Sequence, residues 1–363
     1  MLKYILVKDM NENNRKKVVI GMSGGVDSSV AALLLKQSGY DVIGVTMDLY
    51  RKEKEDAEDT ISDAKKVCEK LNIPFYTLDF KNEFKKYVID YFSNEYMNGR
   101  TPNPCIECNK HLKFGLLLSK AQELFNADYI ATGHYAKIAF NNDSGRYYIK
   151  ESDATGKDQT YVLYNLNQEQ LKHVLMPLGD YTKEQIREIA TQNGFITANK
   201  KDSQEICFVE DNDYAGFIEK KYNYKNVPGD FVDTKGNSYG KHKGIIHYTI
   251  GQRRGLGLSL KSPLYVKSVD AKTNKVILCP KEDLFSDSLI CNNINLITIS
   301  QLDGPLSAMV KIRYSAPKVR ATLIPIDTTS IKVVFDQPQR AITPGQAVVF
   351  YDDNIVIGGG TII

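Results

Sequence analysis

The chain has 363 residues, more than a single hydrophobic core usually contains, so its length favours two or three domains. Apolar residues make up 42% and charged residues 25% of the sequence, as in an ordinary soluble globular protein, and no low-complexity tract or repeat is present. The net charge of +3 is too small to indicate a polyanion-binding surface over the whole protein, so any nucleic-acid contact must be local.

The first third of the chain alternates between strand and helix patterns. Val18–Met22 is a short apolar run typical of a buried parallel strand, Ser28–Gln37 has helical spacing and ends at Gly39, and Val42–Met47 is a second strand. The alternation continues with helices and strands expected at residues 61–71, 75–80, 84–92, 112–125 and 129–132. The predicted fold class is therefore α/β, with an N-terminal doubly wound, Rossmann-like parallel sheet that has helices on both faces.

The pattern changes after this alternation. Two short strand-like runs lie near Tyr147, and Thr182 and Gln185 form a capping box that opens a helix reaching Asn193. The α/β signal fades near Tyr214. We expect a catalytic domain at 1–214 that precedes the two smaller domains.

Residues 228–275 contain many glycines and short alternating strands. Residues 285–363 read almost wholly as strands, with turns expected at Asp336–Pro338 and Pro344–Gly345. We therefore expect a small mixed linker domain at 215–284 and a C-terminal β-barrel at 285–363.

A glycine and serine loop, Met22–Ser29, lies between the first strand and the first helix. Backbone N–H groups and the positive helix end favour a phosphate there, and Gly24 and Gly25 permit close backbone approach. The serines offer hydroxyl donors, and Asp27 could hold a magnesium ion or orient the loop. The loop lacks the ending of a Walker loop and the spacing of a dinucleotide fingerprint, and the bland alternative is a turn that binds nothing.

This loop resembles the PP-loop of the ATP pyrophosphatases, which cleave ATP between the α and β phosphates. The resemblance implies ATP with Mg²⁺ as cofactor. Met47, at the end of the second strand, would contact the adenine, although a buried core methionine is an equal alternative. The implied ATP-binding residues are Gly21, Met22, Ser23, Gly24, Gly25, Val26, Asp27, Ser28, Met47 and Gly133.

The six cysteines are too sparse for a disulfide scaffold, and Met1–Met10 lacks the apolar core and cleavage site of a secretory signal. No stretch has the length of a membrane span. We therefore expect a cytoplasmic protein. In that compartment a close pair such as Cys105 and Cys108 is more often catalytic or metal-binding than structural.

Cys105 and Cys108 lie in a proline-spaced loop that leads into the helix expected at 112–125. Positive potential from the helix start and from nearby basic residues would lower a thiol pKa there and enrich the thiolate. Cys207 follows in a polar setting at Lys201–Phe208. By contrast, the structural interpretation suits Cys68, Cys279 and Cys291.

Several motifs are spread along the chain: the PP-loop, Asn103-Pro104 with Cys108-Asn109, Ala131–Tyr135, Lys157–Gln159, Ser203–Phe208, Gly240–Gly244, Tyr248–Gly257, Lys311–Tyr314, Phe335–Tyr351 and Gly358–Gly360. Together they resemble the bacterial tRNA-specific 2-thiouridylase family over essentially the whole chain. The resemblance implies that ATP adenylates the C2 oxygen of the wobble uridine (U34) in tRNAs for Lys, Glu and Gln. Sulfur then replaces that oxygen, giving 2-thiouridine, AMP and pyrophosphate.

By the same resemblance, Cys207 carries the sulfur as a persulfide, and Cys108 is the catalytic nucleophile that forms a transient disulfide with it. The sulfur would come from a cysteine desulfurase or a sulfur relay protein. Asn103, Pro104 and Cys105 would contact the target base. The implied tRNA-contacting residues are His134, Lys157, Asp158, Gln159, Arg313, Tyr314 and Gln346.

Some alternatives stay open. Many relatives have aspartate where this chain has Cys105, so Cys105, Cys108 and Cys207 could instead supply three thiolates to a [4Fe–4S] cluster. The loop could serve an ATP pyrophosphatase with another acceptor, as in argininosuccinate or GMP synthesis, but that does not explain the separated cysteines. A non-catalytic tRNA-binding protein is disfavoured because Ser23, Asp27 and both reactive cysteines are intact.

Overall fold

The computed structural model describes residues 15–50, 56–154, 156–200, 206–210, 212–259 and 262–363, and the side chains within 56–59 are not described. The chain forms two compact units. The first draws on the chain up to Tyr87, on Ile106–Gln204 and on Asn354–Val356, and the second on Val88–Cys105, Glu205–Asp353 and Ile357–Ile363. No helix within the described ranges is both long and apolar enough to cross a lipid bilayer.

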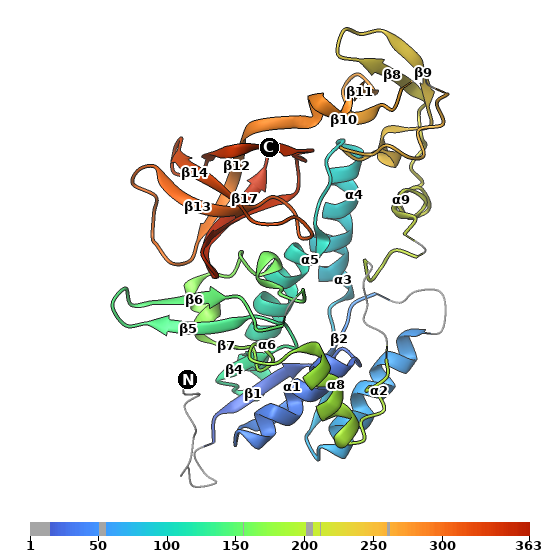
Figure 1. Ribbon diagram of the computed structural model, residues 1–363. Helices are drawn as coiled ribbons and strands as arrows, with labels where there is room; N and C mark the ends of the chain where they lie inside the picture. The colour runs from blue at the N-terminus through green and yellow to red at the C-terminus, as the bar shows by residue number, and fades with distance from the viewer. Residues whose placement is uncertain (1–14, 51–55, 155, 201–205, 211, 260–261) are drawn as a thin grey trace. The chain divides into compact units, whose positions relative to one another are not determined.

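A parallel sheet forms the centre of the first unit (Figure 1). Its strand order is β3-β2-β1-β4-β7, and every neighbouring pair is parallel. The strands are β1 (Lys17–Gly21), β2 (Asp41–Asp48), β3 (Phe75–Asp79), β4 (Tyr129–Ala131) and β7 (Val174–Leu175). The chain moves from β1 to β2 on one side, while β4 pairs with β1 on the other. The carboxyl ends of β1 and β4 therefore flank a topological switch point, where ligands bind in sheets of this kind.

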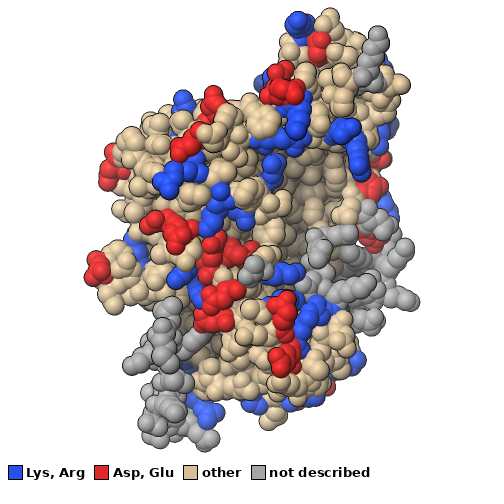
Figure 2. Space-filling model, in the orientation of Figure 1, with Lys and Arg blue, Asp and Glu red and all other residues tan. Residues whose placement is uncertain are grey.

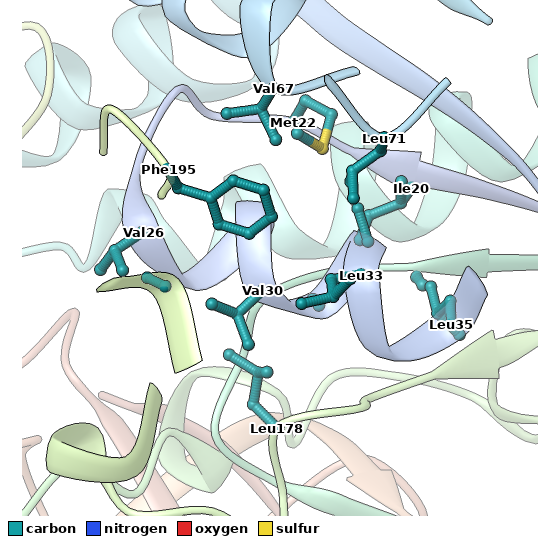
Figure 3. Packing of buried hydrophobic residues seen from close by; sticks show 14 of the residues in the cluster. Ile20, Met22, Val26, Val30, Leu33, Leu35, Val67, Leu71, Leu178 and Phe195 are labelled. Atoms are coloured by element: carbon teal, nitrogen blue, oxygen red, sulfur yellow. The ribbon is translucent and has the colours of Figure 1, made fainter. Parts of the chain in front are cut away.

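Helices cover both faces of this sheet, as the alternation predicts. Val18 and Ile20 of β1 share a buried cluster with Val30 of α1, Val67 of α2 and Ile186 of α8, and Figure 3 shows Phe195 and Leu178 beside Val30. Helix α6 contacts β4, and its buried residues Leu117, Leu118 and Ala121 lie outside this cluster. The helical segments assigned wholly or partly to this unit are α1 (Val26–Gln37), α2 (Asp56–Lys70), α3 (Lys81–Phe84), η2 (Lys85–Ile89), α5 (Pro104–Glu107), η3 (Cys108–Leu116), α6 (Leu117–Phe125), η4 (Thr160–Val162), α7 (Gln168–Lys172) and α8 (Lys183–Gln192). A hairpin of β5 (Lys137–Asn141) and β6 (Arg146–Lys150) accounts for the strand-like runs near Tyr147.

The second unit contains a mixed sheet and a barrel. The mixed sheet has the order β10-β11-β8-β9, in which β8 and β11 are parallel. The barrel has the order β12-β15-β14-β13-β16-β17 and closes through β12 and β17, where Cys291 pairs with Ile362. The elements are α4 (Asp90–Met97), α9 (Tyr214–Tyr222), β8 (Gly229–Asp233), β9 (Ser238–His242), η5 (Ile245–His247), β10 (Tyr265–Asp270), β11 (Lys275–Cys279), η6 (Lys281–Leu284), β12 (Phe285–Leu296), β13 (Leu306–Lys311), β14 (Val319–Pro325), β15 (Ile331–Arg340), β16 (Ala347–Asp352) and β17 (Ile355–Ile362). The expected mixed region and barrel are confirmed.

The turn expected at Asp336–Pro338 is wrong, because these residues lie inside the long strand β15. Phe285 and Ser286 pair with Arg340 and Gln339, whereas Ser288 pairs with Val334, so the register shifts and the strand bulges around the proline. Pro338 has no N–H to donate to the ladder, and a bulge is one of the few places where a strand accepts it.

The helix expected to begin at residue 112 begins at Pro104 instead. Asn103 accepts a hydrogen bond from the N–H of Cys105 on its Oδ1 atom (3.1 Å), and Pro104 occupies the first helical position, where its missing N–H costs nothing. Helical backbone then continues through a π-helical segment, Cys108–Leu116, into α6. Cys105 thus lies in the first turn and Cys108 about one turn further, so the sequence interpretation placed the cysteines too early relative to the helix.

Candidate active site

The loop between β1 and α1 is shaped by its own serines. The N–H of Ser23 donates to Oγ of Ser28 (3.2 Å), and the hydroxyls of Ser28 and Ser29 donate to the carbonyl of Gly25 (3.2 and 2.8 Å). Both of the latter serines are buried. Gly25 is the N-cap of α1 and supplies no side-chain cap, so the first turn of the helix is left for an anion to cap. These contacts favour a phosphate cradle over an idle turn.

Two glycines permit the close approaches that this cradle needs. Gly24 has φ of +66°, and a Cβ there would lie 2.4 Å from the carbonyl oxygen of Thr60. Gly133 directly follows Thr132 at the end of β4, and a Cβ there would lie 2.9 Å from the N–H nitrogen of Ser28. The loops after β1 and β4 therefore touch at the switch point, and any side chain at residue 133 would cover the start of α1.

Met47 lies near the carboxyl end of β2, at the same edge of the sheet as Gly21. It is partly exposed, whereas the preceding Thr46 is buried and donates its hydroxyl to the carbonyl of Met22 (2.8 Å). Met47 is thus not a fully buried core residue. Its position is compatible with a ligand at this edge.

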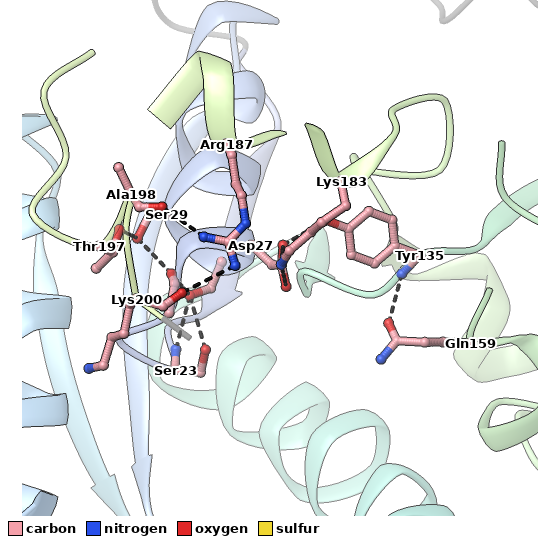
Figure 4. A network of polar contacts seen from close by, with 12 residues as sticks. Ser23, Asp27, Ser29, Tyr135, Gln159, Lys183, Arg187, Thr197, Ala198 and Lys200 are labelled. Carbon is pink, nitrogen blue, oxygen red and sulfur yellow. Dashed lines mark hydrogen bonds and ion pairs between the residues drawn. The ribbon is translucent and has the colours of Figure 1, made fainter. Parts of the chain in front are cut away.

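An ion pair forms one side of the cradle (Figure 4). The ammonium of Lys183 lies 2.7 and 2.9 Å from the two carboxylate oxygens of Asp27, and the hydroxyl of Tyr135 donates to Oδ1 of the same carboxylate (2.7 Å). Gln159 holds Tyr135 in turn, since its side chain accepts from the N–H of Tyr135 (2.9 Å). Of the two roles foreseen for Asp27, orienting the loop is the one these contacts support.

A second lysine braces the loop from outside. Lys200 donates to the carbonyl of Gly24 (3.1 Å) and pairs with Asp63 (3.0 Å). Arg187 of α8 donates to the carbonyls of Ala198 and Lys200 (3.0 and 3.3 Å), which fixes the segment that carries this lysine. The loop is therefore held in shape before any ligand arrives.

Sequence reasoning missed Lys183, Lys200 and Arg187 because all three are more than 150 residues from the loop. One local signal could have indicated Lys183. It is the first residue of α8, directly after the N-cap Thr182, where the helix dipole disfavours a cation. A lysine in that place, buried to 7% exposure, needs an anionic partner.

The three cysteines expected to be reactive differ in their exposure. Cys108 is buried at the start of η3, whereas Cys105 and Cys207 are exposed and belong to the second unit. Residues 203–205 of the motif around Cys207 lie outside the described residues. Next to Cys108, Asn109 donates to the carbonyl of Val162 (3.0 Å).

The remaining thiols, of Cys68, Cys279 and Cys291, are buried, which agrees with their structural interpretation. Burial raises the pKa of Cys68 and of Cys291 to about 12 and raises the pKa of Cys279 as well. In the part of the chain that the structure describes, no three His, Cys, Asp or Glu side chains are grouped closely enough to hold a metal ion.

Three of the residues expected to contact tRNA make internal hydrogen bonds in the first unit. His134 is buried and shares a hydrogen bond with Thr132 (2.7 Å), and burial together with Lys113 holds the pKa of His134 well below its usual range. Asp158 accepts from the N–H and hydroxyl of Thr160 (3.1 and 2.6 Å), and burial raises its pKa. Gln159 holds Tyr135, as described above.

The corresponding residues of the second unit lie on or beside the barrel. Gln346 donates to the carbonyls of Thr101 and Pro102 (2.8 and 3.4 Å), directly before Asn103. Tyr314 is 42% exposed, with the ammonium of Lys311 5.5 Å from its ring centre. An exposed ring with a nearby cation is the kind of surface on which a base can stack.

Known domain families match nearly all of the chain. The tRNA methyl transferase HUP domain matches residues 16–211, the tRNA methyl transferase PRC-barrel domain matches 215–280, and the aminomethyltransferase beta-barrel domain matches 286–362. The order of the three matches follows that of the parallel sheet, the mixed sheet and the barrel.

Several curated bacterial proteins are similar over their whole length. The tRNA-specific 2-thiouridylase MnmA of Clostridium perfringens is 54% identical over 96% of this chain and 98% of its own. The proteins of the same name from Acetivibrio thermocellus and Clostridioides difficile are 52% and 53% identical, each over 96% of this chain and at least 98% of their own. The chain therefore belongs to the tRNA-specific 2-thiouridylase MnmA family.

Proposed function

We propose that this protein is an ATP-dependent tRNA sulfurtransferase that converts the wobble uridine of tRNA to 2-thiouridine. The observation that carries the proposal is the approach of Gly133 to the N–H of Ser28, which leaves the uncapped start of α1 open to a phosphate. The relatives of this chain, named tRNA-specific 2-thiouridylases, supply the substrate class. We also propose the domain boundaries 1–214, 215–284 and 285–363, which the three family matches support.

ATP makes the uridine oxygen a leaving group. The C2 oxygen attacks the α phosphorus, pyrophosphate departs, and AMP remains on the oxygen. The chain's part is to hold the phosphates at the start of α1 between Gly24 and Gly133, with the adenine beside Met47. The donor set fits a polyphosphate, because main-chain N–H groups at the start of α1 line the cradle. Magnesium would neutralise phosphate charge when bound.

Sulfur then replaces the activated oxygen. The terminal sulfur of a Cys207 persulfide attacks C2, and AMP leaves with the oxygen. The Cys108 thiolate attacks Sγ of Cys207, the S–S bond breaks, and the sulfur stays on the uridine. A Cys108–Cys207 disulfide results, so an external thiol reductant must supply two electrons before the next turnover. Burial of Cys108 and exposure of Cys207 suit these roles, since only the carrier must meet a sulfur-donor protein.

Contact with tRNA must rest on local features. On the face shown in Figure 2, basic and acidic side chains are interspersed, which agrees with the small net charge. The exposed ring of Tyr314 offers a stacking surface. We propose that tRNAs for Lys, Glu and Gln are the substrates, with Asn103, Pro104 and Cys105 at the base and contacts from His134, Lys157, Asp158, Gln159, Arg313, Tyr314 and Gln346.

The iron–sulfur alternative receives no support from the described residues. Cys105, Cys108 and Cys207 form no metal-binding group with one another or with other described His, Asp or Glu side chains.

The test is to incubate the purified protein with ATP, a sulfur donor and unmodified tRNA, and to analyse the nucleosides for 2-thiouridine. We expect thiolation with wild type and none with Cys108→Ser or Cys207→Ser, both of which should still bind tRNA. Cys279→Ser is the matched control and should remain active. The proposal fails if thiolation is absent under both conditions, that is, in air and also under anaerobic conditions after iron reconstitution. Activity seen only after reconstitution would favour the cluster instead.

A further inference from the structure

Lys183 occupies an unusual place for a lysine. It is only 7% exposed, and it is the first residue of α8, where the aligned peptide dipoles make a positive charge unfavourable. Burial of an ammonium group is costly unless an anion compensates it. The position of Lys183 therefore requires a compensating interaction within the cradle.

The compensation comes from Asp27. Both carboxylate oxygens of Asp27 lie within 2.9 Å of the ammonium, and Tyr135 donates to Oδ1 from a buried position. The ammonium also lies 5.8 Å from the centre of the Tyr135 ring. Figure 4 shows Lys183 and Tyr135 directed at the same carboxylate. Asp27 is thus fixed in position by donors from two segments distant in sequence.

Asp27 itself creates an electrostatic problem for the proposed substrate. It lies in the first turn of α1, the part of the helix that would receive the phosphates of ATP. In the absence of a ligand, a carboxylate in this turn stabilises the helix through its favourable interaction with the helix dipole. The same negative charge repels a bound polyphosphate. A cation bound to this carboxylate removes most of the repulsion while leaving the backbone N–H groups uncovered.

We propose that Lys183 is a positioning residue that cancels the charge of Asp27 and so makes the start of α1 receptive to the phosphates of ATP. This inference rests on the proposed function, because it assumes that the cradle binds ATP. Its substance is a charge balance: the affinity for ATP depends on the sum of the charges at residues 27 and 183. The competing role, in which the ammonium of Lys183 leaves Asp27 and binds a phosphate directly, predicts a different result for the double variant.

The experiment measures binding of α,β-methylene-ATP, which cannot be cleaved between the α and β phosphates, to the full-length protein by calorimetry. Lys183→Met should weaken binding about tenfold or more, as expected for one uncompensated charge beside a polyanion. Asp27→Asn combined with Lys183→Met should restore the affinity to within about threefold of wild type, because neither charge remains. Lys120→Met is the matched control, since Lys120 pairs with Glu123 on an exposed helix surface.

Each outcome decides one question. If wild type does not bind the analogue, the proposed function fails, and this inference, which rests on it, fails with it. If wild type binds but Lys183→Met binds equally well, or the double variant stays as weak as Lys183→Met, the charge balance is wrong. Lys183→Arg, which keeps the charge, should retain affinity within about threefold, and a tenfold loss there would overturn the proposal. Should Lys183→Met not fold, the double variant still decides, because removing both members of a buried pair is better tolerated.

Steady-state thiolation adds a readout that general structural damage would not reproduce. Lys183→Met should raise KM for ATP about tenfold with kcat changed much less, because its effect is on the charge met by the bound nucleotide. KM for tRNA should stay unchanged. A fall in kcat with KM for ATP unchanged would contradict a role in phosphate binding.

Discussion

Gln346 of the barrel donates its side-chain amide to the main-chain carbonyl of Thr101, 2.8 Å away, although 245 residues separate the two in sequence. The contact is reinforced on both sides. The N–H of Thr101 donates to the carbonyl of Pro344 (2.9 Å), and a Cβ on Gly345 would lie 3.1 Å from the Thr101 backbone. The barrel turn at 344–346 therefore supports the stretch that leads to Asn103 and the start of α5.

We predict that Gln346→Leu weakens this support. The carbonyl of Thr101 loses the hydrogen bond that the Gln346 side chain donates. The free energy of unfolding should therefore fall by about 1–2 kcal/mol. Because the residues that follow are proposed to meet the target base, kcat for thiolation should fall while KM for ATP stays unchanged. Denaturant unfolding and steady-state kinetics measure both effects. Gln339→Leu is the control, because Gln339 donates to the carbonyls of Gln337 and Pro338 within its own strand. An equal loss in that variant would contradict the explanation.

Alanine substitutions at two glycines with nearly the same backbone conformation separate the cost of backbone strain from the cost of a steric clash. Gly24 has φ of +66° and Gly145 has φ of +65°. A Cβ at Gly24 would lie 2.4 Å from the Thr60 carbonyl oxygen, whereas nothing lies within 4 Å of one at Gly145. Gly145→Ala should therefore cost only about 1 kcal/mol, the price of a left-handed residue. Gly24→Ala should cost about 3 kcal/mol or more, because the backbone of residue 60 or the loop itself must move.

The functional consequence should differ in the same direction. Gly24→Ala displaces the phosphate loop, so binding of α,β-methylene-ATP should be lost, while Gly145→Ala should bind it like wild type. Calorimetry on both variants, together with thermal unfolding, tests this. Normal nucleotide binding by Gly24→Ala would show that the phosphates do not contact this loop.

The sequence predicted local features correctly where a residue type has a strong preference for one local conformation, as glycines in tight turns and capping residues at helix starts do. Gly24 and Gly25 predicted a cradle, and Thr182 and Gln185 predicted a capping box that the structure contains. Pro344–Gly345 predicted a turn, and Gly345 has positive φ in the structure. These signals depend on neighbours within a few residues. The order of strands and helices followed from apolar spacing for the same reason.

The features that the sequence did not predict depend on contacts between segments that are distant in the chain. The pairing of Lys183 with Asp27 spans 156 residues, and nothing near either one indicates the other apart from the cation at a helix start. Asp336–Pro338 has the composition of a turn, yet pairing with β12 keeps it in a bulged strand. Asn103-Pro104 is also a signal for the start of a helix, and the structure has a helix start there. On sequence alone, the same two residues are interpreted as contacts to the target base, and the helix is expected to begin at residue 112.

The cysteines should differ sharply in reactivity. Cys105 and Cys207 are exposed, whereas Cys68 and Cys291 are buried with pKa values raised to about 12. At about pH 8 the thiolate fraction of the latter pair is on the order of one in ten thousand, and only the thiolate reacts. Brief treatment of the native protein with iodoacetamide followed by peptide mass spectrometry should label Cys105 and Cys207 first. Labelling of Cys68 before unfolding would contradict its place in the core.

Burial of His134 should make stability depend on pH. Its pKa in the folded protein lies well below 6.5, because burial and Lys113 oppose its protonation, whereas in the unfolded chain it protonates near the ordinary value. Below about pH 6.5 the unfolded state therefore binds the extra proton, and the free energy of unfolding falls by up to about 1.4 kcal/mol per pH unit from this residue alone. Above that range the residue is neutral in both states and makes no pH-dependent contribution.

The measurement is denaturant unfolding of wild type and His134→Asn between about pH 5 and pH 7.5. Asparagine places a polar atom near Nδ1, so the hydrogen bond with Thr132 can persist while the titration is removed. The variant should lose less stability on acidification than wild type. Some slope should remain, because burial also lowers the pKa of His242 and His247. A slope in His134→Asn equal to that of wild type would show that His134 does not titrate differently on folding.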